Sequence, residues 1–143
     1  MKQNNKVEKC RKIAYWITTG LLSFGMLSGG IAQLLRLQGT ADGILNLGYP
    51  SYFMSILGTW KIIGVTVLLL PRFRLFKEWA YAGFFFAMTG AVFSHLANSE
   101  GIGEITAPAL FAVLAVLSWR LRPSNRKIPY INSSVKVSSG KSL

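Results

Sequence analysis

Four long runs of apolar residues, separated by short polar segments, dominate the pattern of this chain. The runs extend over residues 13–35, 52–70, 79–96 and 105–119. At about 1.5 Å per residue the first three are roughly 27 to 34 Å long as helices, which is enough to cross the hydrocarbon core of a bilayer. The fourth reaches a similar length when it is extended to 102–121. The pattern therefore predicts an all-α fold, a polytopic membrane four-helix bundle.

The connections between the runs are short. Residues 36–49 form the longest of them and include Gly39, Asp42, Gly43 and Asn46, which favour turns, so we expect a loop over the outer face. Pro50 opens the second span at a position where its missing N–H has no helical partner to lose. Only residues 72–78 separate the second span from the third, which predicts that these two helices are antiparallel neighbours.

The two ends of the chain differ from the membrane domain, which we place over 13–123. Residues 1–12 and 124–143 are polar and basic, with too little apolar surface to fold alone. We expect a mobile basic leader and a disordered basic tail. The first apolar run is longer than the about 7 to 15 residues typical of a signal peptide, so we expect it to be retained as a span.

The distribution of Lys and Arg predicts how the chain is oriented. Five basic residues precede the first span, three lie between the second and third, six follow the fourth, and the opposite loops carry Arg36. Basic flanks resist translocation, so both termini are predicted to be cytoplasmic, in the plasma (inner) membrane of a bacterium. The net charge of +11 then reflects topology and attraction to anionic lipids. It requires no nucleic-acid partner.

The cysteine and histidine content limits the chemistry. The chain has one cysteine, Cys10, and one histidine, His95. A disulfide, a C-x-x-C relay and a two-histidine haem or zinc site are therefore excluded within one chain. We expect no intrinsic cofactor and no metal site, so any redox cofactor would come from a partner.

Small residues recur at helical spacing in two spans. Gly25 and Gly29 form a G-x-x-x-G pattern in the first span, and Gly83, Ala87 and Ala91 follow at four-residue steps in the third. Such stripes let helices approach closely. Packing within the bundle explains both stripes, and a homodimer is the alternative interpretation.

Aromatic and acidic residues mark the predicted span ends. Glu78 lies at the start of the third span, where an anion is favoured at a helix N-terminus. Six Trp and Tyr residues match an aromatic belt at the membrane surface. They are Trp16, Tyr49, Tyr52, Trp79, Tyr81 and Trp119.

One lysine lies inside a predicted span. Lys61 is eleven residues after Pro50 and ten before Pro71, so it is about 15 Å from either end of the helix. Gly58 and Gly64, three residues on either side, place it on the least bulky face, which points into the bundle. Burying an ammonium group in the membrane is costly unless something pairs with it. Lys61 therefore predicts a site, a cavity or a partner.

Three further polar side chains lie toward the outer ends of their spans: Gln33, His95 and Glu104. We expect them to line a ligand pocket together with Lys61, displaced toward the outer face. The alternative is a structural hydrogen-bond network that orients the helices. The sequence leaves both interpretations open.

Several short segments resemble the DoxX-like family of small four-span membrane proteins. They are Leu47-Gly48-Tyr49-Pro50, Gly58-Thr59-Trp60-Lys61, Lys77-Glu78-Trp79-Ala80-Tyr81-Ala82-Gly83, Gly90-Ala91 and Ser94-His95. The resemblance covers about residues 13–123. The wider family takes its name from a membrane subunit of an archaeal thiosulfate:quinone oxidoreductase, so the resemblance implies a link to quinone or sulfur redox metabolism. Many members have no assigned activity.

The leading hypothesis is a pocket for a quinone-like hydrophobic molecule in a membrane subunit of a redox complex. Lys61 would donate a hydrogen bond to a quinone oxygen, and His95 would pass protons toward the outer face. Electrons would come from a redox partner protein, so we do not expect an enzyme that acts alone. One alternative is a membrane scaffold in which Lys61 pairs internally. Another is a small transporter, which four unbroken spans without an inverted repeat disfavour.

Overall fold

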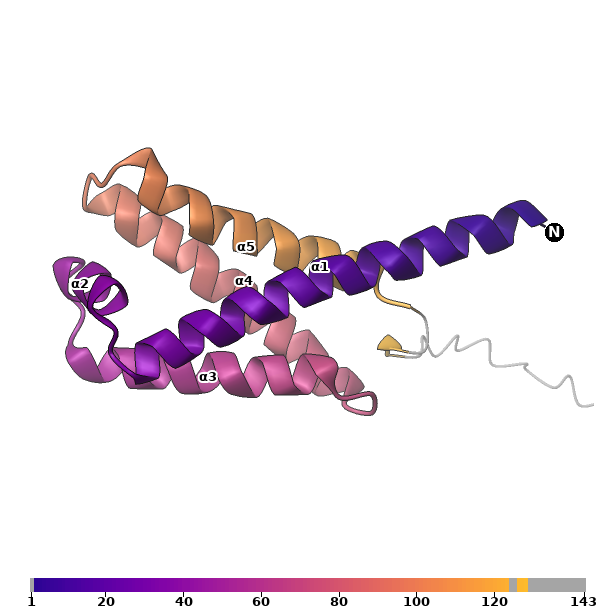
Figure 1. Cartoon of the computed structure of the whole chain (residues 1–143), viewed down its shortest axis with the longest axis horizontal. Coiled ribbons are helices and arrows are strands. Elements are labelled where there is room, and N and C mark those ends of the chain that lie inside the picture. The colour runs from indigo at the N-terminus through magenta and orange to yellow at the C-terminus, as the bar shows by residue number, and fades with distance from the viewer. Residues whose placement is uncertain (1, 124–125, 129–143) are drawn as a thin grey trace, which may run out of the picture.

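The computed structural model describes residues 2–123 and 126–128, and the side chains from residue 6 onward. Over these residues it contains five α-helices and no strand (Figure 1). The helices are α1 (Lys2–Leu34), α2 (Gln38–Asn46), α3 (Ser51–Leu69), α4 (Arg74–Ala97) and α5 (Ile102–Leu121). All but α2 include a stretch long and apolar enough to cross a membrane. The predicted all-α membrane bundle with four spans is confirmed.

The four long helices form a closed ring of neighbours. Helix α1 packs extensively against α3 and α5, and α4 packs extensively against α5. Helices α3 and α4 are joined by a short turn but pack less extensively, and they diverge toward the end of the bundle where α2 lies (Figure 1). We call this end, which also holds the turn between α4 and α5, the α2 end. The opposite end, which holds the start of α1 and the end of α5, is the terminal end.

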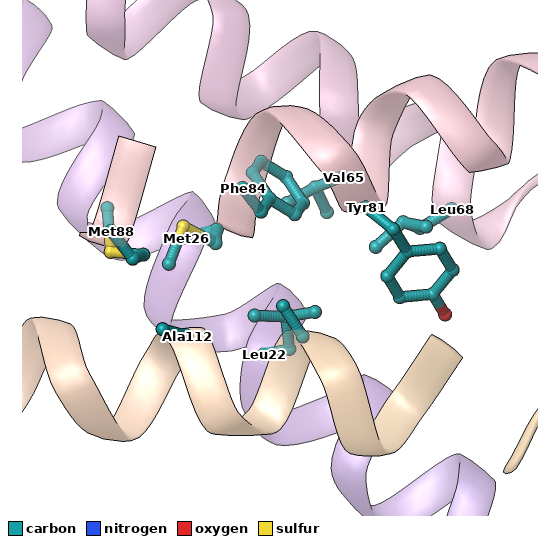
Figure 2. Close-up of a cluster of buried hydrophobic side chains, with 9 residues drawn as sticks. Leu22, Met26, Val65, Leu68, Tyr81, Phe84, Met88 and Ala112 are labelled. Atoms are coloured by element: carbon teal, nitrogen blue, oxygen red, sulfur yellow. The ribbon is translucent and has the colours of Figure 1, made fainter. Parts of the chain in front are cut away.

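The hydrophobic core lies between the spans and draws on all four of them (Figure 2). Its buried members are Leu22, Met26, Val65, Leu68, Tyr81, Phe84, Met88, Ala112 and Ala115. Large apolar side chains are also exposed: Phe24 is 76% and Phe93 is 70% exposed. An apolar outer surface of this kind suits helices surrounded by lipid, because lipid tails are as apolar as these side chains.

Glycines in α1 permit close helix contacts within the chain. A Cβ atom at Gly25 would lie 2.1 Å from the ring of Phe111, and one at Gly58 would lie 2.7 Å from the carbonyl oxygen of Gly30. The small face of α1 therefore packs against α3 and α5 of the same chain. The homodimer remains a prediction.

The segment 36–49, expected to be a loop, contains helix α2. Gly39 and Gly43 disfavour an isolated helix, but α2 packs against α1 and α3, and this packing stabilises it. The turns flank the helix: Arg36 and Gly48 have positive φ angles of 51° and 82°. The expectation of an irregular loop was wrong because tertiary contacts outweigh local propensity.

The basic leader is also helical. Helix α1 begins at Lys2, so residues 2–12 continue the first span. Extending an existing helix avoids the cost of nucleation, and Lys12 lies 3.1 Å from Glu8 one turn earlier. The expectation of a mobile leader was wrong for this reason. The predicted disordered tail, 124–143, lies outside the described residues except for 126–128.

Candidate functional site

A cavity of about 420 Å³ lies at the α2 end, between α2, α3 and α4. The side chains that the sequence singled out, Gln33, Lys61, His95 and Glu104, all line it, and each comes from a different span. Its size is within the roughly 300–1,000 Å³ typical of small-molecule sites. Much of the remaining wall is apolar and includes Ile44, Leu47, Phe53, Leu57, Phe86 and Met88.

Lys61 lies deep in the membrane domain. It is ten residues after Ser51 and eight before Leu69, which places it about 15 Å and about 12 Å from the two ends of α3. Its side chain runs past the glycines of α1: a Cβ atom at Gly29 would lie 3.8 Å from Lys61 Nζ. Lys61 is half-buried, and no hydrogen-bond or ion-pair partner contacts it within the described part of the chain. The ammonium group is therefore available to a ligand.

Gln33 carries a second unused polar group. The residue is 6% exposed, and its side-chain oxygen is buried with no hydrogen-bond partner among the described residues. Leaving such an atom unpaired costs about 1–3 kcal/mol. The two ends of an amide are interchangeable by a flip of the side chain, so Gln33 can offer either a donor or an acceptor to a ligand.

His95 is paired with an acidic residue that the sequence analysis did not include in the site. Its Nδ1 lies 2.5 Å from Oε2 of Glu100, and the side-chain amide of Asn98 donates to the other carboxylate oxygen at 2.8 Å. These hydrogen bonds, that of His95 foremost, hold the pKa of Glu100 below its ordinary value of 4.5. Glu104, the expected neighbour of His95, is an exposed residue of the cavity wall.

Two hydroxyl groups connect α4 to the segment before α3. The Tyr49 and Ser94 hydroxyls are 2.8 Å apart, and the Tyr49 ring stacks on Phe53 with centroids 4.7 Å apart. All three residues line the cavity. Tyr49 was expected in the aromatic belt, and both hydroxyl residues lie in the segments that resemble the family.

A second cavity, of about 340 Å³, continues along α3 and α4 toward the terminal end. It shares Leu57, Lys61 and Ala87 with the first cavity, so Lys61 lies at the junction of the two. Apart from Lys61 it is lined by apolar residues: Leu57, Trp60, Ile63, Gly64, Val67, Phe76, Trp79, Ala80, Gly83, Phe84 and Ala87.

At the terminal end, another lysine is buried and fully paired. Lys77 is 0% exposed and donates to the carbonyl oxygens of Val67 and Leu68, both at 2.7 Å, and to that of Leu70. Lys77 was expected in the connection before the third span, which was predicted to begin at residue 79. Helix α4 instead begins five residues earlier, at Arg74. Lys77 therefore faces the last carbonyls of α3, which have no partner within their own helix.

Hydroxyl groups from three helices meet beside Lys77. Ser118 lies 2.6 Å from the hydroxyl of Thr19 and 2.8 Å from that of Tyr81, and all three residues are buried. The assignment of Tyr81 to the aromatic belt was wrong, because its ring belongs to the core (Figure 2). Packing between α1, α4 and α5 decides this.

Glu78 links α4 to the end of α5. It accepts hydrogen bonds from Arg122 Nη2 and from the Trp119 indole nitrogen, each at 2.6 Å. Arg122 is 2% exposed and lies over the Tyr81 ring, 5.1 Å from its centroid. The expected contact of Glu78 with its own helix dipole is replaced by this ion pair, since Glu78 is in the second turn of α4 and not at its first residue.

Comparison with known proteins supports the resemblance noted in the sequence. A family model described as the DoxX-like family matches residues 17–118. The matched range contains every residue named above as lining either cavity. Searches of curated proteins and of solved structures returned no significant match.

Proposed function

The chain belongs to the DoxX-like family and is an integral membrane protein, and we propose that it binds a quinone-like hydrophobic small molecule in the cavity at the α2 end. The observation that carries this proposal is Lys61, an ammonium group on the cavity wall without a partner among the described residues. A charge at this depth of a membrane usually serves a ligand, an ion or a proton pathway.

The chemistry of the wall suits a flat ring that carries acceptor oxygens. Lys61 would donate a hydrogen bond to one oxygen, and the Gln33 amide offers a second contact from α1. The rings of Phe53 and Phe86 supply apolar surface for the ring itself. When bound, a quinone would supply an oxygen-bearing ring that takes up two electrons and two protons. The positive charge of Lys61 would favour negative charge on the nearer oxygen.

We further propose that the chain works as a subunit of a quinone-linked redox complex. Its single cysteine and single histidine cannot supply the two histidines of a bis-histidine haem or the four ligands of an iron–sulfur cluster, so we propose that electrons come from a redox partner protein. His95, which lines the cavity and is hydrogen-bonded to Glu100, would exchange protons with the aqueous side.

Lys61 has no partner within residues 2–123 and 126–128, and this favours the ligand proposal over a scaffold. A scaffold needs Lys61 to be paired inside the bundle, as Lys77 is. Neither Glu78 nor Glu100 serves this purpose, since they bind Arg122 and His95. The ligand hypothesis therefore accounts for Lys61 with fewer assumptions.

We propose that both termini lie in the cytoplasm of a bacterium, with the α2 end outside. Cys10 is exposed and is the one cysteine of the chain, so it reports on the terminal end directly. A membrane-impermeant maleimide should label Cys10 in inverted vesicles and not in intact cells. A Ser99→Cys variant that also carries Cys10→Ser should show the reverse, and labelling of Cys10 in intact cells would contradict this orientation.

The ligand proposal is tested by mass spectrometry of small molecules that co-purify in a mild detergent. The wild type is compared with Lys61→Met, and with Thr59→Val, which removes a hydroxyl bonded within α3. We expect a quinone or a similar compound in the wild type and in Thr59→Val, and its loss from a folded Lys61→Met. Titration with a short-chain quinone, followed by tryptophan fluorescence, provides a second measurement. Equal binding by Lys61→Met would refute the proposal.

A further inference from the structure

We infer that the second cavity binds a long apolar chain attached to the head of the ligand, and that this ligand reaches Lys61 sideways, from the lipid between α3 and α4. We call this cavity the chain groove. The inference rests on the proposed function, because the head in the first cavity is what the chain would be attached to. It adds a second binding site and a class of ligand, a polar head with a linear hydrocarbon chain.

The chain groove and the first cavity lie next to each other. The two cavities share Leu57, Lys61 and Ala87, so they adjoin at these side chains, and a molecule that occupied both would pass Lys61. The unpartnered Gln33 and Lys61 lie on the first wall, whereas the chain groove is apolar beyond Lys61. This sequence of a polar site followed by an apolar one matches the two parts of an amphiphile.

The chain groove opens toward the lipid. Trp60 and Trp79 on its wall are 66% and 65% exposed, and both belong to spans, so this side of the groove faces lipid. On the inner side, the Phe84 ring packs against Gly64, where a Cβ atom would lie 2.6 Å from the ring. This contact separates the chain groove from the core. The groove is therefore open to the membrane and closed to the interior of the bundle.

Helix α4 leaves open space beside the chain groove. A Cβ atom added at Gly83 would meet nothing within 4 Å, although Gly83 lies inside a span and lines the chain groove. A glycine within a helix costs roughly 1 kcal/mol relative to alanine. Ala80 and Ala87, about one turn on either side of Gly83, also line the chain groove and have small side chains. From Lys61 to Val67 the groove follows α3 for about 9 Å, so a longer chain would continue into the lipid.

Gly83→Leu tests the inference because it fills the chain groove without a clash. Gly20→Leu is the matched control: Gly20 is also a span glycine with open space around it, and it lines neither cavity. The probes are a quinone with a decyl chain and the same quinone ring without a chain, titrated into the full-length protein in detergent. We expect Gly83→Leu to weaken binding of the decyl quinone about tenfold or more, as the loss of buried methylene groups would do. Binding of the bare ring should not change, and Gly20→Leu should match the wild type for both probes.

The other outcomes are equally informative. If Gly83→Leu binds the decyl quinone as tightly as the wild type does, the chain groove holds bilayer lipid and the inference is overturned. If Gly83→Leu weakens both probes equally, the groove has no separate role for the chain, which also overturns it. If the wild type binds neither probe, the proposed function fails first. Should Gly83→Leu lose its helical circular dichroism, Gly83→Ala replaces it, with a smaller loss expected for the decyl quinone alone.

Discussion

Lys61 and Lys77 both lie on spans among apolar side chains, yet they differ in their hydrogen bonding. Lys77, at the terminal end, is fully buried and donates to two carbonyl oxygens of α3 and to that of Leu70 just after the helix. Lys61, on the wall of the cavity at the α2 end, contacts no partner among the described residues. A buried polar group that is paired strengthens a fold, whereas one left unpaired weakens it and is available for binding.

The neighbours of the two lysines show this contrast only in part. At the terminal end, Ser118 joins two other hydroxyls and Glu78 pairs with Arg122, although Nη1 of Arg122 is buried without a hydrogen-bond partner among the described residues. At the α2 end, His95 pairs with Glu100, while the buried oxygen of Gln33 has no partner within the described part of the chain. The clearest difference between the two ends is therefore the pairing of their lysines, and a binding site of this kind is expected to cost stability.

The largest expected difference is in stability, between two variants in which one lysine is replaced by methionine. Methionine keeps the length of the side chain and removes its charge. Lys77→Met should lower the free energy of unfolding by about 3 kcal/mol, because carbonyl oxygens at the end of α3 lose a charged donor. Lys61→Met should leave it unchanged or raise it, because Lys61 has no partner to lose in the part of the chain that the structure describes. Reversible unfolding in mixed micelles, followed by circular dichroism, measures both. A similar loss in the two variants would erase the contrast and favour a structural Lys61.

The next effect concerns the ion pair of the terminal end. Glu78→Gln should destabilise the protein by about 2 kcal/mol, because it leaves the buried Arg122 without its counter-charge. Adding Arg122→Gln should restore part of this loss, and a double-mutant cycle gives the coupling between the two residues. Binding of a short-chain quinone should not change. Additive losses in the cycle would show that the pair contributes nothing measurable.

A smaller effect is expected for the shared hydroxyl. Ser118→Ala removes the partner of both Thr19 and Tyr81, and hydrogen bonds between membrane helices are each worth about 0.6 kcal/mol on average. We expect a loss of about 1 kcal/mol in the same unfolding assay. Thr106→Ala, which removes a hydroxyl bonded only within α5, is the control. A loss no larger than that of the control would place the stability of this end elsewhere.

The smallest effect is a pH dependence at the α2 end. The pKa of Glu100 is lowered from 4.5 by hydrogen bonds from His95 and Asn98, so the folded state favours the carboxylate. This stabilisation is present above pH 4.5 and is lost as the pH falls through the lower folded value. Carbon-detected NMR of the side-chain carboxyl should show titration below 4.5, and Asn98→Ala should move it upward. Titration at 4.5 or above would contradict the pairing.

Much of the fold could be predicted from the sequence, and so could the neighbourhood of the site. Span lengths follow from runs of apolar residues, and the depth of Lys61 follows from counting along one helix. Gln33, His95 and Glu104 were expected beside Lys61 because each lies toward the same end of its span, and all four line one cavity. Whether they bind a ligand remains a prediction.

The details of pairing were not predictable in the same way. Glu104 was expected near His95, but the turn after α4 brings Glu100 to the imidazole. Tyr81 was expected at the membrane surface, but the rotation of α4 turns its ring into the core. Neither apolar periodicity nor spacing records how a helix is rotated against its neighbours.

The sequence by itself determined the class of this protein, its four spans and the presence of a lysine in mid-membrane. These depend on hydrophobic length and rise per residue, which are local properties of the chain. Only the tertiary structure decided that Lys77 is paired while Lys61 has no partner among the described residues, and that a groove opens between α3 and α4. Those outcomes depend on how helices cross and on residues as far apart as Thr19 and Ser118. Packing brings such residues together, and no single segment specifies it.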